Sequence, residues 1–515
     1  MAFGKVLSAV TLGLLVEPVY VEADVSNGLP VFHMVGYLAS EVKEASERVR
    51  TAVKNSGIEL PPKRIVMNLA PATVRKRGAS FDLPIALSLL AALGKFPPKA
   101  LEGIMVVGEL SLDGSVRPVS GILPMVLEAK SQGCVSCIVP EENVREAALV
   151  EQMKIIGAES LGQLCRYLGG QEEILPKTGG RGEEAYWTYP NSPEEGDVDF
   201  CDIRGQEAVK RAAEIAVAGG HNLLLVGPPG SGKSMIARRI PTILPAPDPE
   251  ESIEITKVYS VAGKVDAEHP LVTGRPFREV HHTVTRAALL GGGSVPLPGE
   301  ISLAHRGVLF LDELAEFPKP VLEVLRQPLE ERKVHLSRVH GNYEFPADFM
   351  LVAAMNPCPC GMSPGFQCTC LPHQIRQYLG HISQPFLDRI DMCVEAPRIR
   401  FEELRGQREE ETSAQIRARV VQAREIQKER FCGKNIAANA SLGVKELEEY
   451  CRLGKREKKL MEQAFSAMNL TARTYHKILK VARTIADLDG EKEISRHHLQ
   501  EAIGYRTIDK KYWGR

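Results

Sequence analysis

The chain has almost no net charge and no apolar run long enough to cross a membrane. Its 515 residues contain 64 Lys and Arg against 65 Asp and Glu, which gives a formal net charge of −1 at pH 7. This excludes a globally positive nucleic-acid-binding protein, so any nucleic acid would be held by a local basic surface or inside a ring channel. The apolar segment at residues 6–16 is too short to span a bilayer and lacks a small-residue cleavage site. We expect a first strand there, no membrane partner, no secretory signal and a cytoplasmic protein.

Cysteine is present in a pattern that argues against disulfides. Four of the eleven cysteines fall close together, as Cys358, Cys360, Cys368 and Cys370. Without a secretory signal, this clustering indicates a reducing compartment and metal binding. Four thiolates suit a closed tetrahedral Zn²⁺ site, which would keep this polar loop folded. Two disulfides or four free thiols are the alternatives, and His373 is a spare ligand candidate.

Length and pattern divide the chain into three folded blocks and one linker. Residues 1–168 alternate strand-like and helix-like segments and predict an α/β domain. Residues 169–199 contain eight acids with several Gly and Pro, which indicates an exposed acidic linker. Residues 200–398 predict a large α/β domain, and residues 399–515 predict a C-terminal α-helical lid.

The expected elements of the outer two blocks can be given by residue number. The strands of the first block are expected at 19–25, 64–69, 103–107 and 136–139, and its helices at 40–56, 83–93 and 121–132. The lid helices are expected at 413–430, 444–451, 456–468, 472–488 and 496–505.

The most informative stretch is residues 227–234, which follow the apolar run 223–226 and match every fixed position of the P-loop pattern. A strand would lead into this loop and a helix would follow it, so that backbone N–H groups surround the phosphates of ATP. Lys233 would reach the β- and γ-phosphates, and Ser234 would offer its hydroxyl to Mg²⁺. The expected nucleotide-binding residues are Gly227, Pro228, Pro229, Gly230, Ser231, Gly232, Lys233 and Ser234. A Gly- and Pro-rich turn without a ligand is the alternative.

A second part of the nucleotide site is expected at residues 308–313. Four apolar residues suited to a buried parallel strand end there in Asp312 and Glu313. Asp312 would hold Mg²⁺ through water, and Glu313 would orient and deprotonate the attacking water, because phosphoryl transfer is catalysed mainly by positioning and charge. An acid that only caps a helix is the alternative.

Three segments agree in order and spacing with the proteolytic domain of Lon proteases: residues 76–84, 107–121 and 138–143. The first block therefore resembles that domain, which implies a fold similar to ribosomal S5 domain 2. On this match Ser80 falls on the family's nucleophile and Leu123 on its catalytic lysine. Since a leucine cannot take a proton, we expect no peptidase activity and interpret Ser80 as a helix N-cap. Rescue by another lysine is the alternative.

Further segments resemble the ComM/YifB family of magnesium-chelatase-like AAA+ ATPases, a group of branch-migration helicases. They are residues 202–206, 275–283, 291–293, 298–302 and 354–361, and the likeness covers nearly the whole chain. The resemblance implies that the second α/β block is a P-loop AAA+ core.

The same resemblance implies roles for three residues outside the P-loop. Asn356 would be sensor 1, which hydrogen-bonds the γ-phosphate or the lytic water. Arg389 would be the arginine finger that completes the neighbouring subunit's site, and Arg473 would be sensor 2. Such a finger contributes about 10³–10⁵ in rate. A surface salt bridge is the alternative for each arginine. His381 stands where an arginine is expected in the family, so no role is assigned to it.

Residues 331–345 predict a β-hairpin. Its expected parts are a strand at 333–337, a turn near 340–342 and a return strand at 343–345. In the family this hairpin and the Gly-rich insert at 291–298 face a ring channel. Lys333, Arg338 and His340 would then contact DNA phosphates, and repetition around a ring would multiply each charge. A solvated hairpin without a ligand is the alternative.

Together these features predict an ATP-driven ring motor that acts on DNA. We expect a homo-hexamer that uses ATP, Mg²⁺ and Zn²⁺, binds single-stranded or branched DNA, and translocates on DNA or migrates branched DNA in recombination or natural transformation. A magnesium-chelatase-type motor would fit the same core, although chelatases usually lack the Lon-like domain and the cysteine cluster. A Lon-like ATP-dependent protease or unfoldase is weakened by Leu123. A nucleotide-gated scaffold is disfavoured because Lys233, Glu313 and Arg389 occur together.

Overall fold

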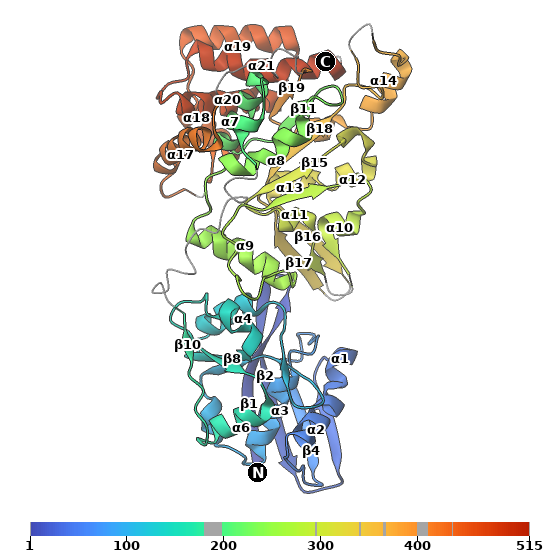
Figure 1. The fold of residues 1–515 in the computed structure, drawn as a ribbon, viewed down its shortest axis with the longest axis vertical. Helices are drawn as coiled ribbons and strands as arrows, with labels where there is room; N and C mark the ends of the chain where they lie inside the picture. The colour runs from blue at the N-terminus through green and yellow to red at the C-terminus, as the bar shows by residue number, and fades with distance from the viewer. Residues whose placement is uncertain are drawn as a thin grey trace.

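The computed structural model describes residues 2–179, 198–293, 296–338, 341–363, 367–398, 410–434 and 436–513. The molecule is elongated (Figure 1). An N-terminal α/β part lies at one end, a parallel sheet lies in the middle, and C-terminal helices lie at the other end. The expected α/β class with a helical C-terminal part is confirmed.

The N-terminal part, residues 2–179, is called the front part below. Its eight-stranded sheet runs in the order β10 (Lys177–Thr178), β9 (Lys154–Ala158), β8 (Ser136–Pro140), β5 (Ile104–Val106), β1 (Ala2–Leu12), β2 (Leu15–Ser26), β4 (Arg64–Ala70) and β3 (Val31–Val35). A separate small ladder joins β6 (Glu109–Leu110) to β7 (Val116–Arg117). Its α-helices are α1 (Ser40–Lys43), α2 (Ala45–Asn55), α3 (Asp82–Ala92), α4 (Ile122–Ser131), α5 (Val144–Ala147) and α6 (Leu161–Leu168).

Two expected boundaries in the front part are wrong. The expected strand at 6–16 crosses a turn, because β1 and β2 form one long antiparallel hairpin that reverses at Gly13. Gly13 has φ 69°, a left-handed conformation that glycine adopts without steric cost. In the expected acidic linker, Lys177–Thr178 instead pairs with β9 as an edge strand. The remaining linker residues 180–197 lie outside the described residues.

Helix α3 forms the centre of the front part. All of its residues are buried, in keeping with a sequence that is apolar on every side. β1 packs directly on it: a Cβ added to Gly4 would lie 2.1 Å from the carbonyl oxygen of Ser88. A glycine at position 4 therefore allows the close approach of strand and helix.

The central sheet has five parallel strands in the order β12 (Phe277–Val280), β15 (Val308–Leu311), β18 (Met350–Met355), β11 (Leu223–Val226) and β19 (Met392–Glu395). β11 is the first of these in the chain but lies between β18 and β19. This order creates a topological switch point at the carboxyl ends of the strands, where open α/β sheets bind their ligands. Because both faces are covered, β11 and β15 are continuous apolar runs and fully buried.

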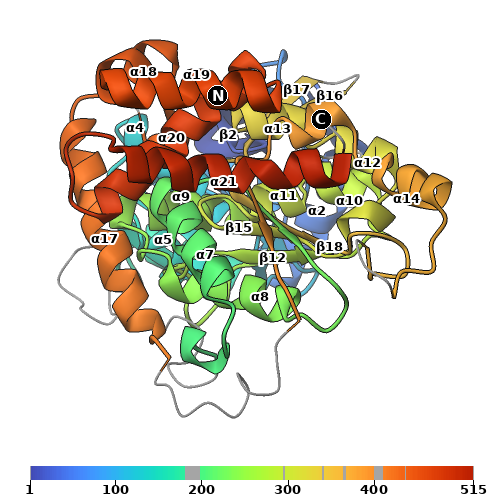
Figure 2. The same cartoon turned by 90° about the horizontal axis from the view of Figure 1, so that it is seen from above.

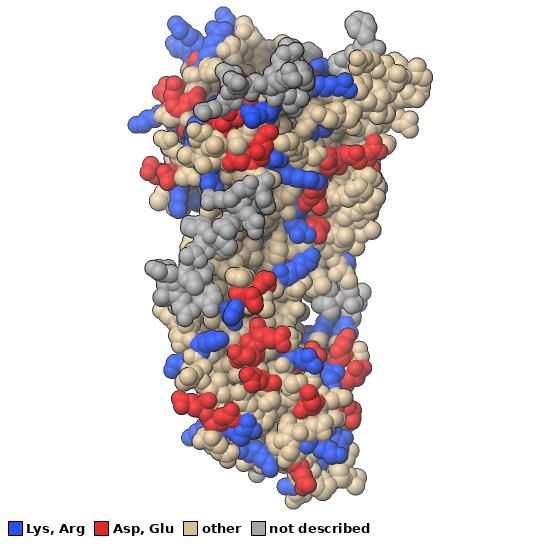
Figure 3. Space-filling view, viewed as in Figure 1, with Lys and Arg blue, Asp and Glu red and all other residues tan. Residues whose placement is uncertain are grey.

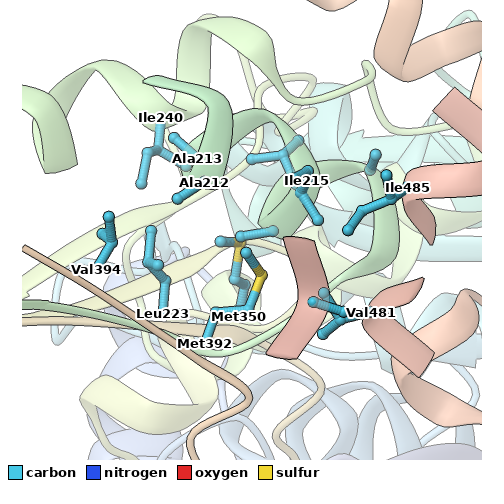
Figure 4. Packing of buried hydrophobic residues seen from close by; sticks show 14 of the residues in the cluster. Ala212, Ala213, Ile215, Leu223, Ile240, Met350, Met392, Val394, Val481 and Ile485 are labelled. Atoms are coloured by element: carbon cyan, nitrogen blue, oxygen red, sulfur yellow. The ribbon is translucent and has the colours of Figure 1, made fainter. Parts of the chain in front are cut away.

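One face of the central sheet packs against α7 and α8, which belong to the same block, and against α20 of the C-terminal helices. Figure 4 shows Leu223, Met350, Met392 and Val394 of the strands meeting residues of α7, α8 and α20. The helices and hairpins around this sheet are α7 (Glu207–Gly219), α8 (Lys233–Ile243), α9 (Pro249–Val261), α10 (Arg286–Leu290), β13 (Gly291–Gly292), β14 (Leu297–Pro298), α11 (Glu300–Leu303), α12 (Lys319–Glu323), α13 (Arg326–Glu331), β16 (Lys333–Arg338), β17 (Gly341–Pro346), α14 (Pro372–Leu379) and α15 (Gln384–Leu387).

The C-terminal helices follow the predicted pattern closely. They are α17 (Ser413–Arg430), α18 (Val444–Tyr450), α19 (Lys455–Met468), α20 (Ala472–Leu488) and α21 (Arg496–Trp513). Only α21 differs by more than a residue, because it continues past 505 and its last turns pack on β19 through Tyr512 and Lys511. α20 packs against α7 and α21, and Figure 2 shows α21 crossing this end of the molecule.

Candidate functional site

The P-loop lies at the switch point of the central sheet, between the end of β11 and the start of α8. Gly230 and Gly232 have φ values of 75° and 82°, left-handed conformations that other residues rarely adopt. A Cβ at Gly227 would lie 2.2 Å from the carbonyl oxygen of Ala396, so crowding requires glycine there. The loop therefore has the conformation in which successive N–H groups can surround an anion.

Lys233 and Asn356 meet in the middle of this site. The Lys233 ammonium donates to the carbonyl oxygens of Gly227 (2.8 Å) and Pro228 (2.9 Å) and to Oδ1 of Asn356 (3.2 Å). Burial lowers the pKa of Lys233. Asn356 follows β18, the strand that pairs with β11, so the two parallel strands carry these side chains to the same sheet edge.

Ser234 and Asp312 form a pair of hard oxygen ligands beside Lys233. The Ser234 hydroxyl donates to Oδ2 of Asp312 at 2.6 Å. A hydroxyl and a carboxylate are the ligands that Mg²⁺ accepts at nucleotide sites. In addition, Oγ of Ser231 and Oε1 of Gln206 are buried and have no hydrogen-bond partner among the described residues. The residues present therefore fit a nucleotide with Mg²⁺.

Glu313 directly follows Asp312 and has a strained backbone. Its φ of 52° and ψ of 48° are left-handed, a conformation that costs a non-glycine residue about 1–3 kcal/mol and that clusters at functional sites. Its side chain is 56% exposed, so it can reach a water molecule. The carboxylate is thus directed away from the sheet and toward solvent.

The sequence analysis did not identify His282, which lies beside Glu313. His282 Nδ1 is 3.5 Å from Glu313 Oε2, and the His282 ring packs against His281 at a centroid distance of 4.0 Å with the ring planes tilted by 36°. β12 and β15 are parallel neighbours with Val280 opposite Leu311, so the residues two positions further on lie side by side. The sequence shows the histidine pair directly after a strand, but not that this strand lies beside the one that ends in Asp312 and Glu313.

Arg389 and Arg473 lie together, on a cavity whose lining includes none of the P-loop residues. Arg389 Nη2 is 2.6 Å and Arg473 Nη2 is 3.4 Å from Oε1 of Glu330. Arg389 is almost buried, whereas the Arg473 side chain is 60% exposed. The cavity has a volume of about 360 Å³ and is also lined by the basic residues Arg332, His476, Lys477 and Lys480.

The four clustered cysteines converge in the loop after Asn356. Their Sγ atoms all lie within 4.8 Å of one another, with distances of 3.4, 3.8 and 3.6 Å among Cys358, Cys360 and Cys368. A tetrahedral Zn²⁺ site with Zn–S bonds of about 2.3 Å has S···S edges of about 3.8 Å, so the cluster has the size of such a site. All eleven cysteines of the chain are free, and His373 is not part of the cluster.

The cysteine loop also touches the P-loop. A Cβ added to Gly361, which has φ 78°, would lie 2.3 Å from Cδ of Pro229. The backbone N–H of Ser363 donates to Sγ of Cys358 at 3.3 Å. A change in the conformation of the cysteine loop would therefore alter its packing against Pro229 of the P-loop.

Comparison with known proteins identifies relatives over the full length of the chain. Residues 21–143 match the family model described as subunit ChlI of Mg-chelatase, residues 199–404 match magnesium chelatase, subunit ChlI, and residues 410–506 match its C-terminal part. The competence protein ComM of Haemophilus influenzae is 43% identical over 99% of this chain and 98% of its own. The uncharacterized protein YifB of Escherichia coli is 41% identical over the same shares. The chain belongs to the ComM/YifB family of magnesium-chelatase-like AAA+ proteins.

The front part carries the likeness to Lon proteases. Lon protease 2 of Bacillus subtilis is 28% identical over 33% of this chain and 35% of its own. Leu123, which we expect at the position of the Lon lysine, is fully buried near the start of α4. Ser80 is not the N-cap of α3 as expected, because Phe81 holds that position and no side chain caps the helix. Lys76 is buried and donates to the carbonyl oxygen of Pro71.

In this ComM/YifB protein two of the predicted DNA-contacting residues, Lys333 and Arg338, lie at the two ends of β16. Lys333 forms an ion pair with Glu344 at 2.6 Å, across the ladder. Arg338 is exposed, and its Nη2 lies 3.6 Å from a Cβ position at Gly292, so the insert and the hairpin are neighbours. His340 lies outside the described residues. The expected turn near 340–342 is wrong in its second half, since Gly341 and Asn342 belong to β17.

Charge on the rest of the surface is mixed. On the face seen in Figure 3, Lys and Arg alternate with Asp and Glu among the described residues. No described helix is both long and apolar enough to cross a membrane.

Proposed function

We propose that this protein is an ATP-driven AAA+ ring motor that translocates on DNA, a branch-migration helicase of recombination or natural transformation. The observation that carries the proposal is the joint placement of Lys233, Asn356, Ser234, Asp312 and Glu313 at one sheet edge of a ComM/YifB chain. The name of the Haemophilus relative, a competence protein, supports the link to transformation.

The proposed chemistry is ATP hydrolysis. Lys233 exchanges its bonds to the loop carbonyls for the β- and γ-phosphates, which brings a full positive charge to the transferred group. Ser234 and Asp312 would hold Mg²⁺, which supplies further charge at the phosphates. Glu313 orients and deprotonates the attacking water, and Asn356 holds that water or the γ-phosphate.

Arg389 and Arg473 are proposed to act on the neighbouring subunit. Both belong to a basic cavity separate from the chain's own P-loop, which supports a role in trans. A closed ring, for which we propose six subunits, brings each such cavity to the next nucleotide, because a heterologous interface closes by rotation. Arg473 thus performs the sensor 2 role across the boundary.

DNA is proposed to pass through the ring along the β16–β17 hairpins. With a formal net charge of −1 and mixed charge on the outer face, a few basic side chains repeated around a channel supply the phosphate contacts. Lys333, Arg338 and His340 are the proposed contacts. Lys333 can bind a phosphate only after its ion pair with Glu344 breaks. Arg338 is exposed and is therefore proposed as the first contact.

The cysteine cluster is proposed to bind Zn²⁺ through Cys358, Cys360, Cys368 and Cys370. Its dimensions support this assignment, and a closed set of four thiolates is typical of a structural site. Thiolate clusters persist in reducing compartments, which supports a cytoplasmic protein.

The test is the ATPase rate of the purified protein without DNA and with single-stranded, duplex and branched DNA. Stimulation by branched or single-stranded DNA, with migration of a synthetic junction, is the expected result. ATP hydrolysis that is indifferent to all three would favour the chelatase alternative. Degradation of unfolded protein would favour the protease alternative.

A further inference from the structure

We propose that the front part of the chain is a strut that fixes the base of the β16–β17 hairpin relative to the nucleotide-binding core. The inference uses the proposed DNA function for one readout only. Two separate contacts carry it: the tip of the β1–β2 hairpin and the start of α4. The strut gives the protease-like domain a mechanical function in place of catalysis.

The first contact joins the tip of the β1–β2 hairpin to β17. A Cβ at Gly13 would lie 3.4 Å from the carbonyl oxygen of Glu344 and 3.5 Å from the ring of Phe345. Leu12 and Leu14 on either side pack against the apolar cluster that contains Phe345. In Figure 1 the β1–β2 hairpin rises out of the front part toward β16 and β17. The tip of the β1–β2 hairpin therefore packs against the β16–β17 hairpin at β17.

The second contact lies where the Lon family has its lysine. Glu146 is buried, and its Oε1 accepts from the Ser260 hydroxyl at 2.5 Å and from the N–H of Leu123 at 3.0 Å. The N–H of Gly121 donates to the carbonyl oxygen of Ser260 at 3.0 Å. Ser260 lies near the end of α9, so the start of α4 is bonded directly to the nucleotide-binding core. Leu123 itself belongs to the apolar cluster of the front part, against which Ile253 of α9 also packs.

The two contacts are connected through the packed elements of the front part. α4 packs on β1 and β2, the strands that carry the tip, inside one continuous sheet and its core. On the core side, α9 reaches the base of the hairpin through charges: Glu254 to Arg306 (3.0 Å), Arg306 to Asp348 (3.2 Å) and Asp348 to Arg332 (2.9 Å). If the β16–β17 hairpin is displaced relative to α9, the hydrogen bonds at Ser260 or the ion pairs from Glu254 to Arg332 must break, or the front part must move with the hairpin.

Hydrogen exchange on the full-length protein tests the strut. Leu14→Asp places a charge in the tip contact, and Leu15→Asp is the matched control, because Leu15 is 66% exposed on the same hairpin. We expect Leu14→Asp to speed exchange of the backbone amides of β16 and β17 by about tenfold, the effect of losing about 1.4 kcal/mol of local stability. Leu15→Asp should leave exchange unchanged.

A second readout connects the strut to the motor. Basal ATPase should persist in Leu14→Asp, because the tip does not contact the P-loop, while stimulation by DNA should be lost. If wild-type ATPase ignores DNA, the proposed function fails and hydrogen exchange still decides the strut.

If Leu14→Asp does not fold, Ser260→Ala and Leu14→Ala weaken the two contacts less severely. The double variant should speed hydrogen exchange in β16 and β17 more than either single variant. Folded variants with wild-type exchange in both hairpin strands would overturn the proposal.

Discussion

Glu330 and Arg389 form an ion pair at 2.6 Å, on the side of the basic cavity that faces the neighbouring subunit in our proposal. The same carboxylate is 3.4 Å from Arg473. One acid therefore holds both of the arginines that are proposed to act in trans. For Arg389 or Arg473 to bind a γ-phosphate, the ion pair between that arginine and Glu330 has to break.

Replacing Glu330 by Gln should raise the ATPase rate at subsaturating ATP. The amide keeps the shape of the side chain but no longer competes with the γ-phosphate for Arg389. The gain should be a few-fold, since an ion pair whose acid is half-exposed to solvent contributes about 0.2–1 kcal/mol. Steady-state ATPase against ATP concentration measures it. A loss of rate comparable to that of Arg389→Ala would mean that Glu330 orients the finger instead.

Glu313→Gln should bind ATP but turn it over about 10²–10⁴-fold more slowly, because the general base is removed while Lys233 is retained. Lys233→Ala should lose nucleotide binding itself. Equilibrium binding of a fluorescent ATP analogue and ATPase assays separate the two effects. Glu316→Gln, an exposed acid in the same segment, is the control and should behave as wild type.

Arg389→Ala should be complemented by Lys233→Ala in mixed rings. In a mixture, some interfaces pair an intact P-loop with an intact finger, and only those interfaces can hydrolyse ATP. Each variant alone should lose about 10³-fold or more in rate. Recovery of activity on mixing, in oligomers verified to contain both chains, is the measurement. Mixed rings without any recovered activity would place the finger in cis.

The cysteine cluster should hold one zinc per chain. Cys358→Ser should release the metal and weaken ATP binding, because Gly361 of the same loop packs on Pro229 of the P-loop. Elemental analysis and nucleotide titration check both parts. Cys432→Ser, at an exposed cysteine outside the cluster, should change neither. Folded protein that is purified without chelators and carries no zinc would contradict the assignment.

Replacing Lys333 and Arg338 by Ala should reduce DNA affinity and DNA-stimulated ATPase together, with basal ATPase retained. The dependence of log affinity on log salt should flatten by about one unit for each DNA phosphate that the variant no longer neutralises. The control replaces Lys99 and Arg50, two exposed basic residues of the front part, by Ala. Binding that does not change with salt, in the wild type, would argue against phosphate contacts altogether.

Local signals were enough to predict much of this protein. The P-loop and the strand before Asp312 are defined by short-range patterns, glycines at fixed spacing and apolar runs that end in acids, and β11 and β15 were predicted at their observed positions. The C-terminal helices were predicted equally well, since α17 begins and ends at the expected residues. Cysteine spacing predicted which thiols could converge, because only a short loop separates them.

What the sequence did not determine depends on contacts between distant segments. His282 reaches Glu313 only because β12 lies beside β15, and strand order is not written in either strand. Arg389 and Arg473 share Glu330 because α13, the segment after α15 and the start of α20 meet at one cavity. The N-cap expected at Ser80 and the strand expected through Gly13 both failed where packing, not local propensity, set the boundary. Sequence thus determined which chemistry the chain carries, and tertiary structure decided which groups act on one another, because side chains far apart in the sequence become neighbours only when the sheet and its helices pack.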